Sequence, residues 1–248
     1  MASLLEKLKT IKKKNDEAQR PWCSVIVPAA GNASRMQGQD KILSHLGGKP
    51  VIVHTLLALQ NCPYVDEVIV VTREDLMATI GDLARRWDCR KVSRIVRGGA
   101  SRAESVWIGV NRADPRAELI GIHDGARPLV SQQVLAEVFT KAVKAGAAAP
   151  AVPVKDTIKE VDKNGVVVRT VERESLRAVQ TPQVFEASII KAALQVAIEK
   201  NLPITDDCSA VELLGKKVLL TQGDYDNIKI TTPGDLVLGE AILKCQQV

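Results

Sequence analysis

The sequence predicts an α/β protein with a Rossmann-like, mostly parallel sheet that is flanked by helices and carries a protruding β-hairpin dimerisation arm. Two observations predict the sheet: short β-branched runs alternate with stretches of helical period, and these runs end in glycine or polar residues. A third observation predicts the arm, because an Asn-Gly pair joins two valine-rich runs that have no helical period. Right-handed crossovers should connect the parallel strands.

The first half of the chain contains three of these strand–helix units. A strand is predicted at residues 24–30, an apolar run that ends at a glycine, and a helix follows at residues 49–60. A second strand, residues 67–72, precedes a helix at residues 74–87. That helix begins with acidic residues and ends with arginines, as the helix dipole favours.

The next two strands follow the same pattern. A third strand, residues 93–99, runs into a Gly-Gly turn before a helix at residues 101–113 that opens with a Ser-x-x-Glu capping box. A fourth strand, residues 118–125, precedes a helix at residues 131–146 that is capped by Ser131 and stops at Gly146. Four βα units in succession therefore account for residues 24–146.

The pattern changes after this point. The arm is expected at about residues 153–175, where valines would be exposed on a lone hairpin and need a partner subunit. A hairpin folded back on its own sheet is the alternative. The elements expected after the arm are a strand at 178–185, helices at 187–200 and 205–215, strands at 217–223 and 227–231, and a helix at 233–245.

Length and composition favour one large domain with a short appendage. The chain has 248 residues, of which 46% are hydrophobic and 25% are charged, as in ordinary globular proteins. We assign residues 23–248 to the domain and residues 1–22 to a basic N-terminal extension. The extension has helical spacing, and a solvated segment is favoured over a tether to a membrane or nucleic acid.

Several classes of protein are disfavoured. Only 3% of the residues are aromatic, and 34 basic residues are mixed with 29 acidic ones, so no nucleic-acid partner is expected. No apolar run approaches the roughly 20 residues that a membrane span needs, so no membrane partner is expected either. The five cysteines have neither zinc-site nor disulfide-framework spacing, which favours a cytoplasmic protein.

Ligands of such sheets bind beyond the carboxyl ends of the strands, and three loops lie there: Ala29–Arg35, Gly98–Ser105 and Asp124–Pro128. The first loop lacks the spacing of a dinucleotide fingerprint or a P-loop. Its small residues, with Arg35 and Lys41, nevertheless suit a di- or triphosphate. A plain strand–helix turn with two solvent-facing cations is the alternative.

Asp124 follows an apolar strand directly and predicts a magnesium ion. A carboxylate beside a polyphosphate is repulsive unless a divalent cation bridges them, and Mg²⁺ commonly takes one or two carboxylates plus phosphate oxygens. Asp226 is a candidate second ligand, although it also fits a simple turn, and Lys229 follows three residues later. His123 is expected to be a packed core histidine.

The sequence has no serine-nucleophile elbow and no cysteine–histidine signature. A reaction without a protein nucleophile is therefore favoured, and transfer of a nucleotidyl group to a substrate phosphate is such a reaction. The acceptor phosphate is already anionic, so the enzyme must align it and neutralise the developing charge. Arg35, Lys41, Lys229 and magnesium could supply this neutralisation.

Seven motifs, in this order, carry a resemblance to a known family: PAAGNASRM, RGGASRAESV, HDGARP, VKDTIKEV with RTVER, QTPQVF, ITDDCSAVE and DNIKIT. From about Ser24 to its end, the chain resembles the 2-C-methyl-D-erythritol 4-phosphate cytidylyltransferases of the non-mevalonate isoprenoid pathway. The resemblance implies a homodimeric nucleotidyltransferase with an exchanged arm. It implies that CTP and the methylerythritol phosphate, a polyol phosphate, are joined with release of pyrophosphate.

The resemblance also implies roles for individual residues. It implies that the triphosphate is bound by Ala29, Ala30, Gly31, Arg35 and Lys41. At cytosine and its sugar it places Gly98, Gly99 and Ser105, with Arg102 supporting the loop. Asp124, with Asp226, would bind magnesium, and Lys229 would stabilise the pentacoordinate phosphorus. On the acceptor side it places Arg127, the partner-arm residues Thr157 and Arg173, and the sugar-pocket residues Thr181 and Thr205.

Three alternatives remain. A ribitol 5-phosphate cytidylyltransferase would use the same chemistry on another acceptor, although HDGARP favours the isoprenoid branch. A non-catalytic nucleotide-binding protein could keep the fold, but Arg35, Lys41, Asp124 and Lys229 together argue against it. A nucleic-acid binder, suggested by a pI of about 8.9, is disfavoured by the mixed charges.

Overall fold

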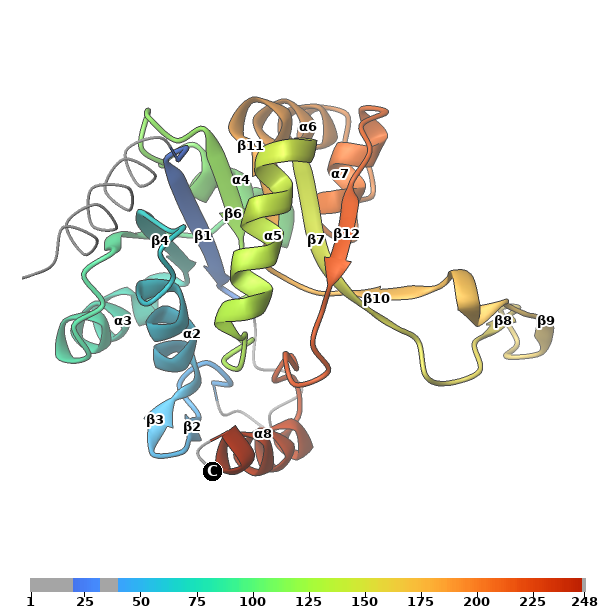
Figure 1. Ribbon diagram of the computed structural model, residues 1–248, viewed down its shortest axis with the longest axis horizontal. Helices are drawn as coiled ribbons and strands as arrows, with labels where there is room; N and C mark the ends of the chain where they lie inside the picture. Colours follow the sequence, from blue (N-terminus) through green and yellow to red (C-terminus); the bar gives the residue numbers. More distant parts are fainter. Residues whose placement is uncertain (1–19, 32–39, 247–248) are drawn as a thin grey trace, which may run out of the picture.

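The structure is a computed structural model and describes residues 20–31 and 40–246. Within these residues one eight-stranded sheet forms the centre, in the order β10-β7-β11-β6-β1-β4-β5, with β12 also paired to β7 (Figure 1). The strands are β1 (Cys23–Ala29), β4 (Glu67–Thr72), β5 (Val92–Arg97), β6 (Leu119–Ile122), β7 (Ala147–Pro153), β10 (Arg177–Val179), β11 (Gln183–Glu186) and β12 (Leu219–Gln222). The predicted α/β class is confirmed.

The order of the strands creates a crevice beside β1. β1 pairs in parallel with β4 on one side and with β6 on the other. The chain runs from β1 through β4 to β5 and then returns to β6 across β1. Connections therefore leave the ends of β1 and β6 in opposite directions, and such a switch point is where open α/β sheets bind ligands.

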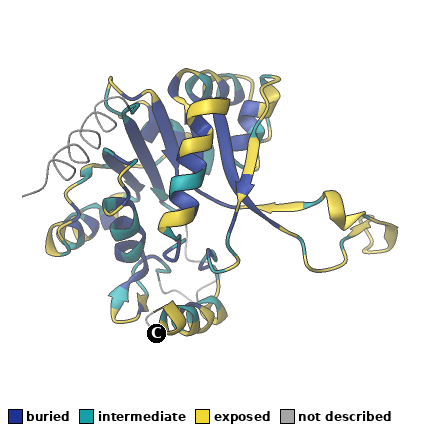
Figure 2. Cartoon of the chain, viewed as in Figure 1, coloured by how far each residue is buried: buried dark blue, intermediate teal, exposed yellow. Residues whose placement is uncertain are grey.

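Helices cover both faces of the sheet. On one face lie α2 (Val51–Gln60), α3 (Glu74–Arg86) and α5 (Gln132–Ala145), and on the other lie α4 (Arg102–Val110), α6 (Ala187–Glu199) and α7 (Asp207–Leu213). Side chains alternate along β1: Val25 and Val27 belong to the first core, and Ile26 belongs to the second. Figure 2 accordingly shows the central strands almost entirely buried.

A small third core lies beyond the carboxyl edge of the sheet. It joins α8 (Pro233–Gln246) to a hairpin of β2 (His45–Leu46) and β3 (Lys49–Pro50), and its buried members include Leu46, Leu129 and Ile230. The Gly47-Gly48 turn of this hairpin has positive φ angles of 55° and 78°, which glycine adopts without strain.

The predicted arm is a hairpin that extends away from the body of the protein (Figure 1). β8 (Lys159–Val161) and β9 (Val167–Thr170) pair only with each other among the described strands, and a 3-10 turn (Arg173–Ser175) follows. The chain reverses direction between β8 and β9 at residues 163–165, where Gly165 has a φ of 81°. Val161 and Val168 are 52% and 63% exposed, so the alternative of a hairpin folded onto its own sheet is wrong.

Four elements differ from the sequence prediction. The single strand expected at residues 178–185 is two strands, β10 and β11, separated by residues 180–182, where Pro182 has no amide hydrogen to donate to a strand ladder. The segment at residues 227–231, expected to be a strand, is irregular. Its side chains alternate between the third core and the cavity, but its backbone pairs with no neighbouring strand among the described residues. β7 was not predicted, since its alanine- and proline-rich sequence has low strand propensity, yet it is buried in the sheet. The β2–β3 hairpin was also missed, although its Gly-Gly pair is a hairpin signal.

The N-terminal extension lies outside the described residues except for residues 20–22, which contact the domain. Arg20 makes a two-point ion pair with Asp66 at 2.6 and 2.8 Å. The ring of Trp22 stacks under the guanidinium of Arg116, whose Cζ lies 3.8 Å from the ring centroid. Among the described helices none has the length and apolar character of a membrane span.

Candidate active site

A cavity of about 500 Å³ opens at the carboxyl ends of β1 and β6, where the switch point predicts a ligand. Its lining combines residues of the three predicted loops with the cations Lys41 and Lys229. The predicted site residues that line it are Ala29, Ala30, Gly31, Lys41, Gly98, Gly99, Arg102, Ser105, Asp124 and Lys229. Arg35 lies outside the described residues.

The loop after β1 presents small residues and a lysine to the cavity. Lys41 reaches across Gly31, since a Cβ atom on Gly31 would lie 3.7 Å from Nζ of Lys41. Arg73, directly after β4, donates to the carbonyl of Gly31 at 3.4 Å and to Oδ2 of Asp40 at 2.7 Å. Arg73 lines the cavity but was not predicted, although a cation at the carboxyl end of a parallel strand was a usable signal.

The glycine loop after β5 is held by the first turn of α4. Oγ of Ser105 accepts from the amide of Gly99 at 3.1 Å and donates to the carbonyl of Ser101 at 2.8 Å. A Cβ atom on Gly98 would lie 2.8 Å from that Oγ and 3.0 Å from Cβ of Ala30, so only glycine lets the two loops approach this closely. Ser105 therefore shapes the predicted nucleotide loop.

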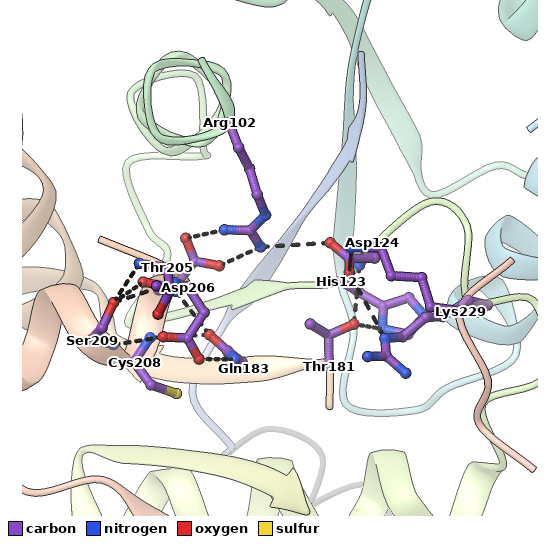
Figure 3. Close-up of polar contacts among 12 residues, drawn as sticks. Arg102, His123, Asp124, Thr181, Gln183, Thr205, Asp206, Cys208, Ser209 and Lys229 are labelled. Atoms are coloured by element: carbon purple, nitrogen blue, oxygen red, sulfur yellow. Dashed lines mark hydrogen bonds and ion pairs between the residues drawn. The ribbon is translucent and has the colours of Figure 1, made fainter. Parts of the chain in front are cut away.

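Asp124 lines the cavity and lies between the cations Lys229 and Arg102 (Figure 3). Its Oδ2 lies 2.7 Å from Nζ of Lys229, and its Oδ1 lies 3.5 Å from Nη2 of Arg102. Burial alone would raise the pKa of Asp124, but Lys229, Arg102 and Arg127 lower it to about 2. The carboxylate that lines the cavity is therefore ionised at neutral pH.

His123 is fully buried behind Asp124, as predicted for a core histidine. Its Nε2 lies 3.2 Å from the carbonyl of Arg127, which can only accept, so Nε2 carries the proton. Nδ1 must then accept from Oγ of Thr181 at 3.0 Å. Burial lowers the pKa of His123 to about 4, so the ring is neutral at physiological pH.

We expect this histidine to make the protein less stable in mild acid. The unfolded chain takes up the proton near pH 6.5, whereas the folded ring resists it until about pH 4. The free energy of unfolding should fall by about 2 kcal/mol from pH 7 to pH 5 through this residue alone. Asp124 is ionised in both the unfolded and the folded protein between pH 5 and pH 7, since its pKa values of 3.8 and about 2 lie below that range. Urea denaturation of His123→Gln should lack this part of the slope; equal slopes would contradict the assignment.

The hydroxyl of Thr181 is committed to the protein. It accepts from the amide of Asp124 at 3.1 Å and donates its only proton to His123. Thr181 is 4% exposed and is not part of the cavity lining. The predicted contact with the acceptor sugar could therefore use only the remaining lone pair of this oxygen, and the observed role is to fix the backbone at Asp124.

Thr181→Val should test this role, because valine keeps the shape and removes both hydrogen bonds. The buried amide and Nδ1 would be left unsatisfied, which should cost about 1–3 kcal/mol of stability. We also expect kcat to fall, since the backbone at Asp124 loses its anchor. Thr221→Val is a matched control, because the buried Oγ of Thr221 has no hydrogen-bond partner in the described structure. Equal melting temperatures for the two variants would contradict the prediction.

The other predicted residues lie away from the cavity of the same chain. Arg127 is largely buried and donates to the carbonyl of Asn227 at 2.6 Å, tying the Asp124 loop to the segment before Lys229. Thr205 is exposed at the start of α7, and Thr157 and Arg173 are exposed on the arm. Nη1 of Arg173 donates to the carbonyl of Lys155 at 2.8 Å.

Asp226 is also absent from the cavity lining. Its amide caps a turn by donating to Oδ1 of Asp224 at 2.9 Å, and no described contact joins its carboxylate to Asp124. The described residues hold no group of three or more His, Cys, Asp or Glu that could bind a metal. Asp124 alone fits Mg²⁺ that takes its other ligands from phosphate and water.

Sequence reasoning missed one more residue, Asp207. Its side chain is fully buried at the start of α7 and makes a two-point ion pair with Arg102. Burial raises the pKa of Asp207, and the charge of Arg102 opposes this rise. The two residues are 105 positions apart, so no local pattern could have paired them.

Comparison with known proteins agrees with this geometry. The family model described as 2-C-methyl-D-erythritol 4-phosphate cytidylyltransferase matches residues 23–245. The chain is 44% identical over 221 residues to the protein of that name from Halalkalibacterium halodurans, which covers 89% of this chain and 96% of the relative. It is 40% identical over 230 residues to the protein of that name from Syntrophus aciditrophicus, covering 92% and 98% of the two chains.

Solved structures give the same result. The 4-diphosphocytidyl-2C-methyl-D-erythritol synthase from Anaerococcus prevotii superposes with a TM-score of 0.80 at 31% identity, over 90% of this chain and 99% of the other. The 2-C-methyl-D-erythritol 4-phosphate cytidylyltransferase from Thermus thermophilus superposes with a TM-score of 0.75 at 33% identity, with the same coverage. The chain therefore belongs to the 2-C-methyl-D-erythritol 4-phosphate cytidylyltransferase family.

Proposed function

We propose that this protein transfers the cytidylyl group of CTP to 2-C-methyl-D-erythritol 4-phosphate and releases pyrophosphate, as a step of non-mevalonate isoprenoid biosynthesis. The observation that carries the proposal is a single cavity, at the switch point of the sheet, that combines two glycine-containing loops with Lys41, Lys229 and Asp124. Membership in the family supports the choice of both substrates.

The chemistry needs no protein base or nucleophile. An oxygen of the acceptor phosphate attacks the α-phosphorus of CTP, and the bond from that phosphorus to the bridging oxygen breaks as pyrophosphate leaves. The loops after β1 and β5 would hold the nucleotide, and Lys41 and Lys229 would neutralise charge on the phosphates. Fixed cations and aligned reactants are the main sources of rate in such transfers.

Magnesium dependence is part of the proposal. Mg²⁺ held by Asp124, together with phosphate oxygens, would supply further charge neutralisation. Asp124 suits this role because its carboxylate is ionised and lines the cavity. Asp124 lines the cavity and Asp226 does not, so we expect the ion to depend chiefly on Asp124.

We also propose that the protein is a homodimer whose arms are exchanged. The exposed valines of β8 and β9 support this, as does the position of Thr157 and Arg173 on the projecting arm. In a dimer these two residues would bind the acceptor phosphate in the partner's cavity. All five cysteines are free thiols, which supports a cytoplasmic location.

A coupled pyrophosphate assay tests the function. CTP, UTP, ATP and GTP are each offered with 2-C-methyl-D-erythritol 4-phosphate or ribitol 5-phosphate, with and without Mg²⁺. We expect pyrophosphate release only with CTP, the methylerythritol phosphate and the metal. Turnover of ribitol 5-phosphate alone would show that it, and not the methylerythritol phosphate, is the acceptor. Binding of CTP without release of pyrophosphate would indicate a non-catalytic nucleotide-binding protein.

A further inference from the structure

The guanidinium of Arg102 lies between two carboxylates (Figure 3), and its distances to them are unequal. Nη1 and Nη2 donate to Oδ1 and Oδ2 of Asp207 at 3.1 and 2.7 Å. Nη2 also lies 3.5 Å from Oδ1 of Asp124, which is longer than an ordinary N–H···O hydrogen bond. Arg102 is thus bound to Asp207 and only close to Asp124.

Asp207 is fixed in place by its surroundings. It is fully buried at the start of α7, where the amides of Asp207 and Cys208 both donate to Oε1 of Gln183 at 3.0 Å. Nε2 of Gln183 donates to the helix-capping Asp206 at 2.8 Å. A planar guanidinium paired at two points with a rigid carboxylate has one favoured orientation, so Asp207 determines where Arg102 points.

The two oxygens of Asp124 differ in their partners. Oδ2 pairs with Lys229 at 2.7 Å, whereas the long contact with Arg102 is the one described ion-pair contact of Oδ1. Oδ1 therefore keeps lone pairs that a cation could use. A shift of Arg102 by less than about 1 Å would convert the long contact into a hydrogen bond and occupy that oxygen.

We propose that Asp207 is a positioning residue that holds Arg102 back from Asp124 and so keeps Oδ1 of Asp124 available to a divalent cation. The inference rests on the proposed role of Asp124 in binding that cation. Without the carboxylate of Asp207, Asp124 is the nearest remaining partner for the guanidinium, and Arg102 then competes with the metal. Removal of Arg102 as well takes away the competitor.

Metal affinity tests this directly, without turnover. Mn²⁺ binding is measured by electron paramagnetic resonance in the presence of saturating CTP analogue, in which a methylene group replaces the α,β-bridging oxygen. Asp207→Asn should weaken Mn²⁺ binding about tenfold or more, the size of effect usual for residues that orient a metal ligand. The double variant Arg102→Met/Asp207→Asn should return to within about threefold of the unmodified protein.

A matched control is available at the opposite end of the sheet. Asp66 makes a two-point pair with Arg20 of the same kind, so Asp66→Asn should leave Mn²⁺ affinity unchanged. Unchanged affinity in Asp207→Asn would overturn the proposal, and so would a double variant that binds Mn²⁺ no better than Asp207→Asn. Failure of the unmodified protein to bind Mn²⁺ would overturn it as well.

Two further outcomes remain decisive. If Asp207→Asn does not fold, as judged by circular dichroism, the double variant decides alone, because it removes both charges of the pair and leaves neither unpaired. Affinity within about threefold of the unmodified protein then supports the proposal, and a tenfold loss overturns it. If the unmodified protein binds Mn²⁺ but releases no pyrophosphate with the methylerythritol phosphate, the proposed acceptor fails while the binding test still stands.

Discussion

Lys229→Met is expected to lower kcat by a factor of about 10² to 10³ while the protein remains folded. Lys229 is the nearest cation to Asp124, at 2.7 Å, and it lines the cavity with Lys41. In the proposed reaction its ammonium group would stabilise negative charge that develops on the phosphorus oxygens during transfer. Because that charge is greatest in the transition state, the loss should fall mainly on kcat and less on the KM for CTP.

The fold should tolerate this change. The side chain of Lys229 is 38% exposed, so methionine can occupy its path without opening a cavity in the core. Lys216→Met serves as a control, because Lys216 is an exposed lysine just before β12. Steady-state kinetics and thermal unfolding of the two variants provide the comparison. A folded Lys229→Met protein whose kcat changes by less than about threefold would contradict the assigned role.

The parts of the fold that the sequence predicted are those in which local pattern and tertiary demand agree. β1 is a β-branched run buried on both faces, and a glycine follows it closely in the chain. Once parallel strands are inferred, their carboxyl ends must share one edge, so the convergence of the loops after β1, β5 and β6 follows. This argument placed Gly31, Gly98 and Asp124 in one cavity, as observed.

The incorrect prediction at residues 227–231 shows the limit of pattern alone. Ile228 and Ile230 do alternate with Lys229, and the alternation separates an apolar core from the cavity. A strand also requires a neighbouring backbone, and here the amide of Ile230 donates to the carbonyl of Ala126 in a loop. β7 is the opposite case, since pairing with β11 and β12 overrides its weak strand propensity.

Contacts between residues distant in the sequence could not be predicted in the same way. The pair of Arg102 and Asp207 joins the start of α4 to the start of α7, and the link from Arg73 to Asp40 joins the end of β4 to the segment before β2. Each depends on the relative placement of two elements that only the folded chain defines. The hydroxyl of Thr181 is similar, because its use by His123 and Asp124 depends on the neighbouring loops.

A mixed dimer should distinguish an exchanged arm from an arm that serves its own subunit. Lys229→Met inactivates the cavity and leaves the arm intact. Arg173→Glu leaves the cavity intact and places a negative charge where the acceptor phosphate would bind, which should lower activity by more than about 100-fold. Arg173 is exposed on the arm, so this change should not unfold the domain. Each variant alone should therefore be nearly inactive.

Co-expression with two different tags and sequential purification yields dimers that contain one subunit of each kind. With exchanged arms, the intact cavity of the Arg173→Glu subunit receives the intact arm of the Lys229→Met subunit, and the dimer should show about half of the unmodified activity. If each arm served its own cavity, both sites would carry a defect and the mixed dimer would be as inactive as its parents. If no protein carries both tags after the two purification steps, the chain does not dimerise. Recovery of activity therefore requires that the hairpin act on the neighbouring subunit, because neither parent supplies both parts of a working site.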